Sequence, residues 1–139
     1  DALTAVDVSR VAIDLARAEP SPAHVEFEVA DIMEYDLHAA GPWDLVVASE
    51  MWPYLGWMYS FYFVGWLASE IYAASAPGAR LLMVDTISGA EDALLEPWLI
   101  ATYRDLMVNV GYEREKETRL EGEESGSAYE FLLTVFVKR

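Results

Sequence analysis

The chain has 139 residues, and 54% of them are hydrophobic, which is enough for one domain with a core over residues 1–139 and excludes intrinsic disorder. Its formal net charge of -15 repels phosphate backbones, so we expect no nucleic-acid partner. Cysteine is absent, which excludes disulfides, thiol catalysis and cysteine-ligated metals from this chain, and the two histidines, His24 and His38, are expected to be solvated, so no metal site is predicted.

The first part of the chain reads as strand, helix, strand. Residues 3–8 are mostly apolar, as buried parallel strands are, and Ser9 follows as a helix N-cap. The helix carries an apolar stripe at helical spacing and is stopped by two prolines. These residues are Val11, Ala12, Leu15 and Ala16 for the stripe and Pro20 and Pro22 for the end. Residues 24–29 alternate apolar and acidic side chains, which predicts a second strand.

The middle of the chain holds a third strand and an uncharged, aromatic-rich stretch. A Gly-Pro turn at residues 41–42 precedes residues 43–48, which are apolar and β-branched. Residues 51–69 approach the length of a membrane span, but they contain one proline and two glycines and have acidic neighbours at both ends. We interpret them as a loop followed by a buried helix over residues 59–74, with no membrane span. The chain also opens without the features of a signal peptide, so a cytoplasmic location is expected.

The next segment predicts a fourth strand and a helix. A turn at residues 77–78 precedes the apolar residues 80–85, which form the strand. Pro97 suits the first turn of the helix that follows, and Gly111 suits its end after Asn109. The side chains that this helix is expected to bury are Leu99, Tyr103, Leu106 and Val110.

The last residues are typical of an antiparallel hairpin. Residues 112–119 alternate among charges like an edge strand, residues 121–127 read as a loop, and residues 129–137 form an apolar strand. Strand–helix repeats that end in a hairpin predict an α/β fold with a doubly wound, mostly parallel, Rossmann-like sheet.

Acidic residues stand at or just after the ends of the predicted strands, where doubly wound sheets bind ligands. These residues are Asp7, Asp31, Glu50 and Asp85. Asp7 can accept hydrogen bonds from both hydroxyls of a ribose, or it can favour the positive end of the next helix, and the pattern alone does not decide between them. Asp31 can accept from an adenine amine while the Ile32 N–H donates to a ring nitrogen, although an Asx turn is the commoner role of a lone aspartate.

Glu50 opens a cluster of aromatic and apolar residues. The cluster is Met51, Trp52, Pro53 and Tyr54. A carboxylate among aromatic rings can orient a cationic amine, accept a proton or face a cofactor's ammonium group, and the rings can hold a cation or stack on a sugar. The alternative is core packing beside a solvated acid.

The order of these motifs resembles that of class I S-adenosylmethionine (SAM) dependent methyltransferases, over nearly the whole chain. The segments that carry the resemblance are LTAVDVS at 3–9, ADI at 30–32, WDLVVASE at 43–50, PGARLL at 77–82 and the closing hairpin. Within that family, SEMWPYL at 49–55 is most similar to the branch of nodulation protein S, the N-methyltransferase of rhizobial chitooligosaccharide synthesis.

The resemblance implies SAM as the cofactor and a methyl transfer to a small-molecule acceptor, with an amine slightly preferred. Asp7 would bind the ribose, Asp31 and Ile32 would bind the adenine, and Glu50 would lie near the methionine end and the acceptor. The cofactor-binding residues implied are Asp7, Val8, Ala30, Asp31, Ile32, Ser49 and Glu50. The catalytic or acceptor-lining residues implied are Glu50, Trp52 and Tyr54.

The family's first strand and glycine-rich loop would precede Asp1, and that strand would lie between those at residues 3–8 and 44–48. Without it, two apolar strand edges lack hydrogen-bond partners, so we expect an upstream segment, a second chain in a homo-oligomer or a rearranged sheet to supply them. Two other functions stay open. One is a non-catalytic methyltransferase-like module whose aromatic stretch binds a protein. The other is a dinucleotide oxidoreductase, against which the hairpin and residues 30–32 argue.

Overall fold

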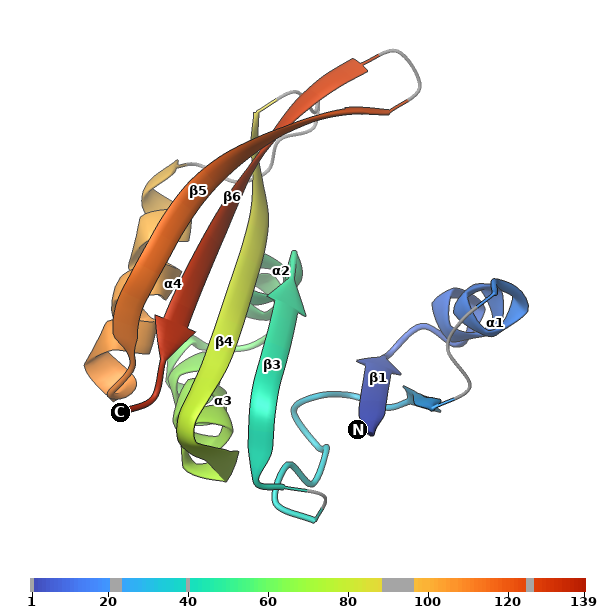
Figure 1. Cartoon of the computed structure of the whole chain (residues 1–139), viewed down its shortest axis with the longest axis horizontal. Helices are drawn as coiled ribbons and strands as arrows, with labels where there is room; N and C mark the ends of the chain where they lie inside the picture. Colours follow the sequence, from blue (N-terminus) through green and yellow to red (C-terminus); the bar gives the residue numbers. More distant parts are fainter. Residues whose placement is uncertain (1, 21–23, 40, 89–96, 125–126) are drawn as a thin grey trace. The chain divides into compact units, whose positions relative to one another are not determined.

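The computed structural model describes the chain in two compact units. The residues described are 2–20, 24–39, 41–88, 97–124 and 127–139. The smaller unit is Asp1–Asp36 and the larger unit is Leu37–Arg139. The elements of each unit can be followed in Figure 1.

The smaller unit is a strand–helix–strand motif. Strands β1 (Leu3–Asp7) and β2 (Val25–Val29) pair in parallel, and helix α1 (Arg10–Ala18) lies between them in the sequence. Ser9 caps α1, since its hydroxyl accepts the Ala12 N–H at 3.3 Å. The two strands, the helix and its cap were all predicted, and the structure confirms them.

The apolar stripe predicted on α1 is largely exposed within this unit. Val11 and Leu15 are 69% and 65% exposed, whereas Ile13, outside the stripe, is 3% exposed. A two-stranded sheet is narrow and covers only one side of a helix. Ile13 is therefore the residue by which α1 packs in the smaller unit.

The larger unit contains a mixed four-stranded sheet in the order β3–β4–β6–β5. Its strands are β3 (Trp43–Ser49), β4 (Ser75–Ser88), β5 (Glu113–Glu124) and β6 (Ser127–Val137). β3 and β4 pair in parallel, and β6 pairs antiparallel with both β4 and β5. The predicted hairpin and the predicted edge position of β5 are confirmed, and the last strand of the chain lies between two earlier ones.

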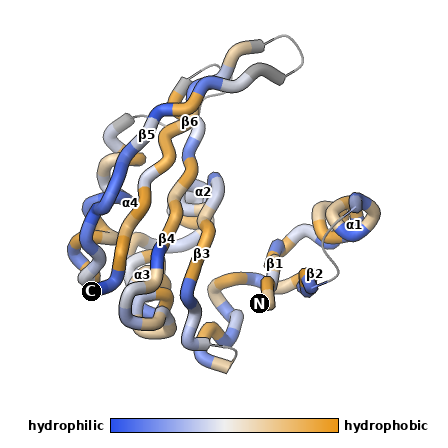
Figure 2. The backbone as a smooth tube through the Cα atoms, viewed as in Figure 1, coloured by the Kyte–Doolittle hydropathy of each residue, from blue (hydrophilic) through white to orange (hydrophobic). Residues whose placement is uncertain are grey.

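The three helices of the larger unit lie on the same face of this sheet (Figure 1). They are α2 (Met51–Met58), α3 (Phe61–Ala74) and α4 (Pro97–Val110). Leu81 and Met83 of β4 and Phe136 of β6 point into this helical layer and are fully buried. On the other face, Leu45 and Val47 of β3 are 51% and 58% exposed. Figure 2 shows the apolar course of β3, β4 and β6 beside the hydrophilic edge strand β5.

The structure corrects the interpretation of residues 51–69. Residues 51–58 form helix α2 and not the expected loop, because Pro53 lies in the first turn, where a backbone N–H has no helical acceptor to lose. The following helix is buried only on its aliphatic side, at Val64, Leu67 and Ile71. Its four aromatic side chains in the first half of the helix are exposed by 45% or more, namely Phe61, Tyr62, Phe63 and Trp66. None of the described helices is long and apolar enough to cross a membrane.

The strands around the hairpin are longer than predicted. Most of the segment 121–127 was expected to be a loop, but β5 continues to Glu124 and β6 begins at Ser127. Backbone hydrogen bonds extend an antiparallel pair without regard to side-chain type, so the polar composition was misleading. The end of α4 was predicted correctly: Gly111 has a φ of +122°, and the Tyr72 ring lies 2.8 Å from where a Cβ would stand.

Lys138, which follows β6, donates hydrogen bonds to backbone carbonyls at the end of α3. Its ammonium donates to the carbonyls of Tyr72 at 2.6 Å and Ser75 at 2.7 Å, and it lies 4.5 Å from the centre of the Tyr72 ring. The last carbonyls of a helix have no helical partner and carry the negative end of its dipole, so a cation there is stabilising.

Replacing Lys138 with methionine should lower the free energy of unfolding by about 1–2 kcal/mol, because the side chain keeps its length but loses its charge and its donors. Urea denaturation measures the change. The same substitution at exposed Lys116 is the matched control and should stay within about 0.5 kcal/mol of the parent. Equal effects at the two positions would show that the helix end does not depend on this cation.

Candidate cofactor and acceptor site

In the smaller unit, the ends of β1 and β2 bring four of the predicted cofactor residues to one edge. The strands pair in register with Asp7 opposite Val29, and the Ala30 N–H donates to the Asp7 carbonyl at 3.1 Å. Asp31 and Ile32 follow directly and are half-buried. The parallel pairing therefore places the expected ribose and adenine contacts beside each other.

The two aspartates of this edge are both held by local backbone donors. Asp7 Oδ1 accepts the Ser9 N–H at 2.6 Å, and Asp31 Oδ1 accepts the Met33 N–H at 2.9 Å. The second contact is an Asx turn, the commoner role of a lone aspartate. These bonds fix the direction of each carboxylate, and a carboxylate that binds a ligand also needs a fixed direction. Val8, next to Asp7, is 65% exposed, so an apolar surface adjoins the carboxylate.

In the larger unit, Glu50 occupies a strained turn between β3 and α2. Its φ of 54° and ψ of 19° are left-handed, and it is the one described residue other than glycine with a positive φ. Left-handed backbone in a residue with a Cβ persists only where surrounding contacts hold it, and such residues cluster at functional sites. Ser49, the residue before it, is exposed at the end of β3.

Glu50 is held by three hydrogen bonds to β4. Its N–H donates to the Val84 carbonyl at 2.9 Å, which prolongs the parallel ladder. Its Oε1 accepts from both the N–H of Thr86, at 2.7 Å, and the hydroxyl of Thr86, at 2.5 Å. The sequence singled out Glu50, but Thr86 was missed, because a threonine inside an apolar strand gives no signal of its own.

The aromatic residues after Glu50 separate into a buried and an exposed group. Trp52 is fully buried, 6.4 Å between ring centres from Tyr103, and its indole N–H has no partner among the described residues. Gly56 admits this packing, because a Cβ there would stand 1.9 Å from the Tyr103 hydroxyl. Tyr54 is 52% exposed and meets Trp57 edge-on at 5.7 Å. Tyr54 thus presents a ring to solvent, whereas Trp52 supports α2 from within.

The fourth acid at a strand end, Asp85, forms a buried ion pair with Arg104. It is 2% exposed and lies 3.0 Å from the guanidinium of Arg104 of α4, which is itself buried. Burial raises the pKa of Asp85 above its ordinary range, although the charge of Arg104 works against that rise. Sequence reasoning missed Arg104, but its spacing from Ile100, Tyr103 and Met107 places it on the buried face of α4.

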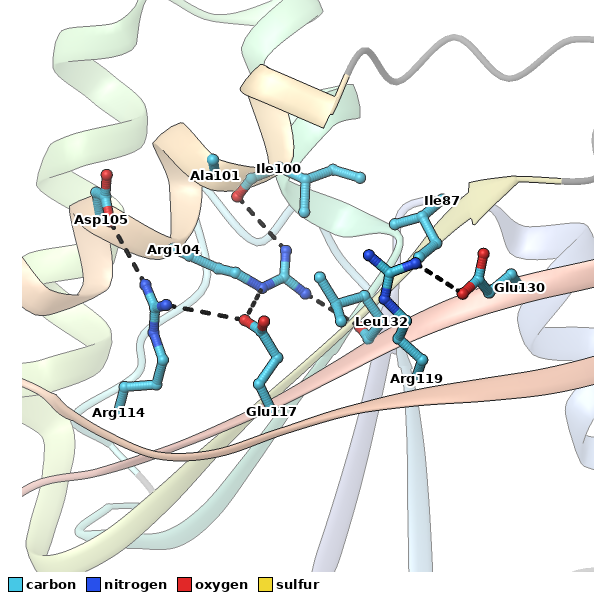
Figure 3. Close-up of a pocket in the computed structure, with 10 residues that line it drawn as sticks. All are labelled: Ile87, Ile100, Ala101, Arg104, Asp105, Arg114, Glu117, Arg119, Glu130 and Leu132. Carbon is cyan, nitrogen blue, oxygen red and sulfur yellow. Dashed lines mark hydrogen bonds and ion pairs between the residues drawn. The ribbon is translucent and has the colours of Figure 1, made fainter.

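A shallow cavity of about 390 Å³ lies between α4 and the hairpin (Figure 3). Its charged lining is Arg104, Asp105, Arg114, Glu117, Arg119 and Glu130. Each arginine there is already paired: Arg104 and Arg114 approach Glu117, at 3.7 and 3.8 Å, and Arg119 meets Glu130 at 3.0 Å. The cavity therefore offers no spare charge to a ligand. Among the described residues, no group of three or more His, Asp or Glu side chains is placed to hold a metal ion.

Several solved structures with the same arrangement of elements are methyltransferases. The N-methyltransferase NodS of Bradyrhizobium japonicum, in complex with S-adenosyl-L-homocysteine, matches 99% of this chain with a TM-score of 0.70 and 20% identity. A SAM-dependent methyltransferase of Methanosarcina mazei and a TehB-like one of Corynebacterium glutamicum also match 99% of it, with TM-scores of 0.66 and 0.65 and identities of 16% and 20%. No protein-family model and no curated protein sequence matches. The chain has the methyltransferase fold.

This likeness confirms the predicted fold class, including the reversed last strand. The chain spans 66% of the NodS chain, 82% of the Methanosarcina protein and 68% of the Corynebacterium protein. At these identities the shared feature is the fold.

Replacing Arg104 with methionine should lower the free energy of unfolding by about 3–5 kcal/mol at neutral pH, because it leaves Asp85 buried without its partner. The loss should shrink in mildly acidic solution. Without Arg104 the pKa of Asp85 rises further, so the folded variant takes up a proton more readily than the unfolded one as the pH falls, and this recovers part of its stability.

Urea denaturation at both pH values measures this dependence. Arg114→Met is the matched control, since Arg114 also approaches Glu117 but is 40% exposed, and it should cost less than about 1 kcal/mol. A loss for Arg104→Met that is small, or the same at both pH values, would contradict the assignment of Asp85 as its buried partner.

Proposed function

We propose that this chain is part of an enzyme that transfers a methyl group from SAM to a small-molecule acceptor, with an amine preferred. The observation that supports it most is the pair of carboxylates, Asp7 and Asp31, that the parallel pairing of β1 and β2 brings to one edge in a methyltransferase fold. One protein of this fold was crystallised with S-adenosyl-L-homocysteine, the product that SAM leaves after methyl transfer. A cytoplasmic location belongs to the same proposal.

The proposal assigns the nucleoside part of SAM to the smaller unit. The Asp7 carboxylate would accept hydrogen bonds from the ribose hydroxyls, beside the exposed side chain of Val8. Asp31 would accept from the adenine amine and the Ile32 N–H would donate to the ring, with Ala30 alongside. Asp7 and Asp31 are already oriented by backbone donors, so little ordering is needed when the ligand binds.

The proposal assigns the acceptor to the larger unit, at the end of β3. Glu50, with Ser49 beside it, would meet the acceptor, and the exposed ring of Tyr54 would contact an acceptor cation or sugar. Trp52 was expected to line the acceptor pocket, but it is fully buried, so it would support α2 from within and would not contact the acceptor. The transfer is a direct displacement at the sulfonium methyl, so alignment of acceptor, methyl and sulfur contributes most of the catalysis.

A second candidate is a non-catalytic module that binds a protein. The exposed aromatic side of α3 favours it, because the side chains of Tyr62 and Phe63 are 77% and 51% exposed. The stretch from Met51 to Ser69 also contains no charged residue. A second copy of the chain, or a segment upstream of Asp1, would also be a partner if it supplied the expected central strand.

Thermal shift of the protein with SAM, S-adenosylhomocysteine and NAD, with any residues that precede Asp1 included, separates these functions. A methyltransferase should be stabilised by SAM and by S-adenosylhomocysteine but not by NAD, because binding to the folded state alone raises the melting temperature. Stabilisation by NAD alone would favour an oxidoreductase. No shift with any of the three would favour the binding module.

Asp7→Asn should weaken SAM binding by about 1.5–3 kcal/mol, because the charge-assisted hydrogen bonds to the ribose are lost. Asparagine keeps an oxygen that can accept the Ser9 N–H, so the start of α1 should remain intact. Isothermal calorimetry with SAM measures the loss, and Asp7→Ala should lose at least as much. Asp14→Asn, an exposed acid of α1, is the matched control. Unchanged affinity in Asp7→Asn would remove Asp7 from the site.

Glu50→Gln should lower methyl transfer more than it lowers the affinity for SAM, because the carboxylate is assigned to the acceptor. Glutamine keeps the oxygen that accepts from Thr86, so the turn into α2 is preserved while the charge is lost. Methyl transfer to small primary amines and calorimetry with SAM give the two values. Asp44→Asn, an exposed acid at the start of β3, removes the same charge and should leave both values unchanged.

A further inference from the structure

The position of Glu50 depends on one neighbouring side chain. Glu50 leaves β3 in a left-handed conformation, which a residue with a Cβ adopts only under constraint. One of its constraints is the backbone bond to the Val84 carbonyl, which any residue at this position would make. The others come from Thr86, whose N–H and hydroxyl both donate to the Glu50 carboxylate. The two donors of Thr86 therefore favour a residue with a carboxylate side chain at position 50.

The two donors of Thr86 converge on a single oxygen. Its N–H lies 2.7 Å and its hydroxyl 2.5 Å from Glu50 Oε1. Two fixed donors on one oxygen define the plane and the rotamer of the carboxylate, and they leave Oε2 as the oxygen that can meet a ligand. Hydrogen bonds to an ionised group are the stronger kind, so this orientation is held firmly in a half-buried position.

The strand also keeps Glu50 apart from the acid next to Thr86. Successive side chains of β4 point to opposite faces of the sheet, so Asp85 faces the helical layer and its partner Arg104, while Thr86 faces the other way. The two carboxylates are near enough that the charge of Glu50 contributes to the raised pKa of Asp85. With Asp85 paired internally, Glu50 is the acid at this strand end that can serve a ligand.

We propose that Thr86 is a positioning residue, which fixes Glu50 Oε1 with two hydrogen bonds and thereby directs Oε2 toward the amine acceptor. This role rests on the proposed methyl transfer. Because Thr86 acts through Glu50 on the acceptor, loss of its hydroxyl should lower the rate of methyl transfer and should leave the affinity for SAM nearly unchanged.

The test compares Thr86→Val with Thr86→Ser in the whole chain. Valine keeps the shape and the N–H but removes the hydroxyl, whereas serine keeps both donors. Methyl transfer from methyl-labelled SAM to a panel of small primary amines gives kcat and KM, and calorimetry gives the affinity for SAM. Thr86→Val should lower kcat about tenfold or more with SAM affinity within about twofold, and Thr86→Ser should restore most of kcat. Thr118→Val, on the same sheet, is the control for loss of a threonine hydroxyl.

Each result decides the proposal. The resonance of the Thr86 backbone amide should move on Glu50→Gln and stay in place in Thr118→Val, because a bond to a carboxylate becomes a bond to an amide. An unmoved resonance overturns the positioning role without any assay of turnover. If Thr86→Val and the parent have equal kcat, the positioning role is wrong, and the proposed methyl transfer is unaffected. A parent chain that binds no SAM, or that methylates none of the amines, overturns the proposed function and this role together.

Discussion

The arrangement of the larger unit depends on the buried contacts of Arg104. From α4 its guanidinium reaches Asp85 of β4 at 3.0 Å, the Thr134 hydroxyl of β6 at 2.5 Å and the Leu132 carbonyl at 3.0 Å. A buried cation is costly unless its donors are satisfied, and a buried carboxylate is costly without its counterion. Any shift of α4 along the sheet would break several of these contacts at once. We infer that the cluster sets the registry of helix on sheet more than it adds to stability.

The site at the end of β3 follows from that registry. Because Arg104 holds Asp85 in the helical layer, the alternation of β4 turns Thr86 to the opposite face. Thr86 in turn accommodates the Glu50 carboxylate, and the left-handed turn at Glu50 leads directly into α2. The buried ion pair and Glu50 are thus linked through the alternation of β4 and the hydrogen bonds of Thr86, and this link explains why Asp85 and Glu50 have different surroundings.

Much of the fold follows from local signals, and the site follows from them only in part. Ser9 and Gly111 mark helix ends by chemistry that acts within a few residues, so both were predictable. Helix α2 was missed because Pro53 suggests a break, and only its position in the first turn makes it harmless. Arg104 and Thr86 were missed because their importance lies in partners distant in the sequence, such as Asp85 for Arg104 and Glu50 for Thr86, and local sequence patterns do not reveal such contacts.

The four acids at the strand ends look alike in the sequence, and their surroundings distinguish them. Asp85 is enclosed with a counterion, so it belongs to the structure. Asp7 is exposed and Asp31 and Glu50 are half-buried, and each is oriented by nearby donors. An acid that binds a ribose is shared by SAM and dinucleotide enzymes, so Asp7 cannot choose between them. Topology distinguishes the two folds: β6, the last strand, enters antiparallel between β4 and β5, as in the methyltransferase fold and unlike an all-parallel dinucleotide-binding sheet.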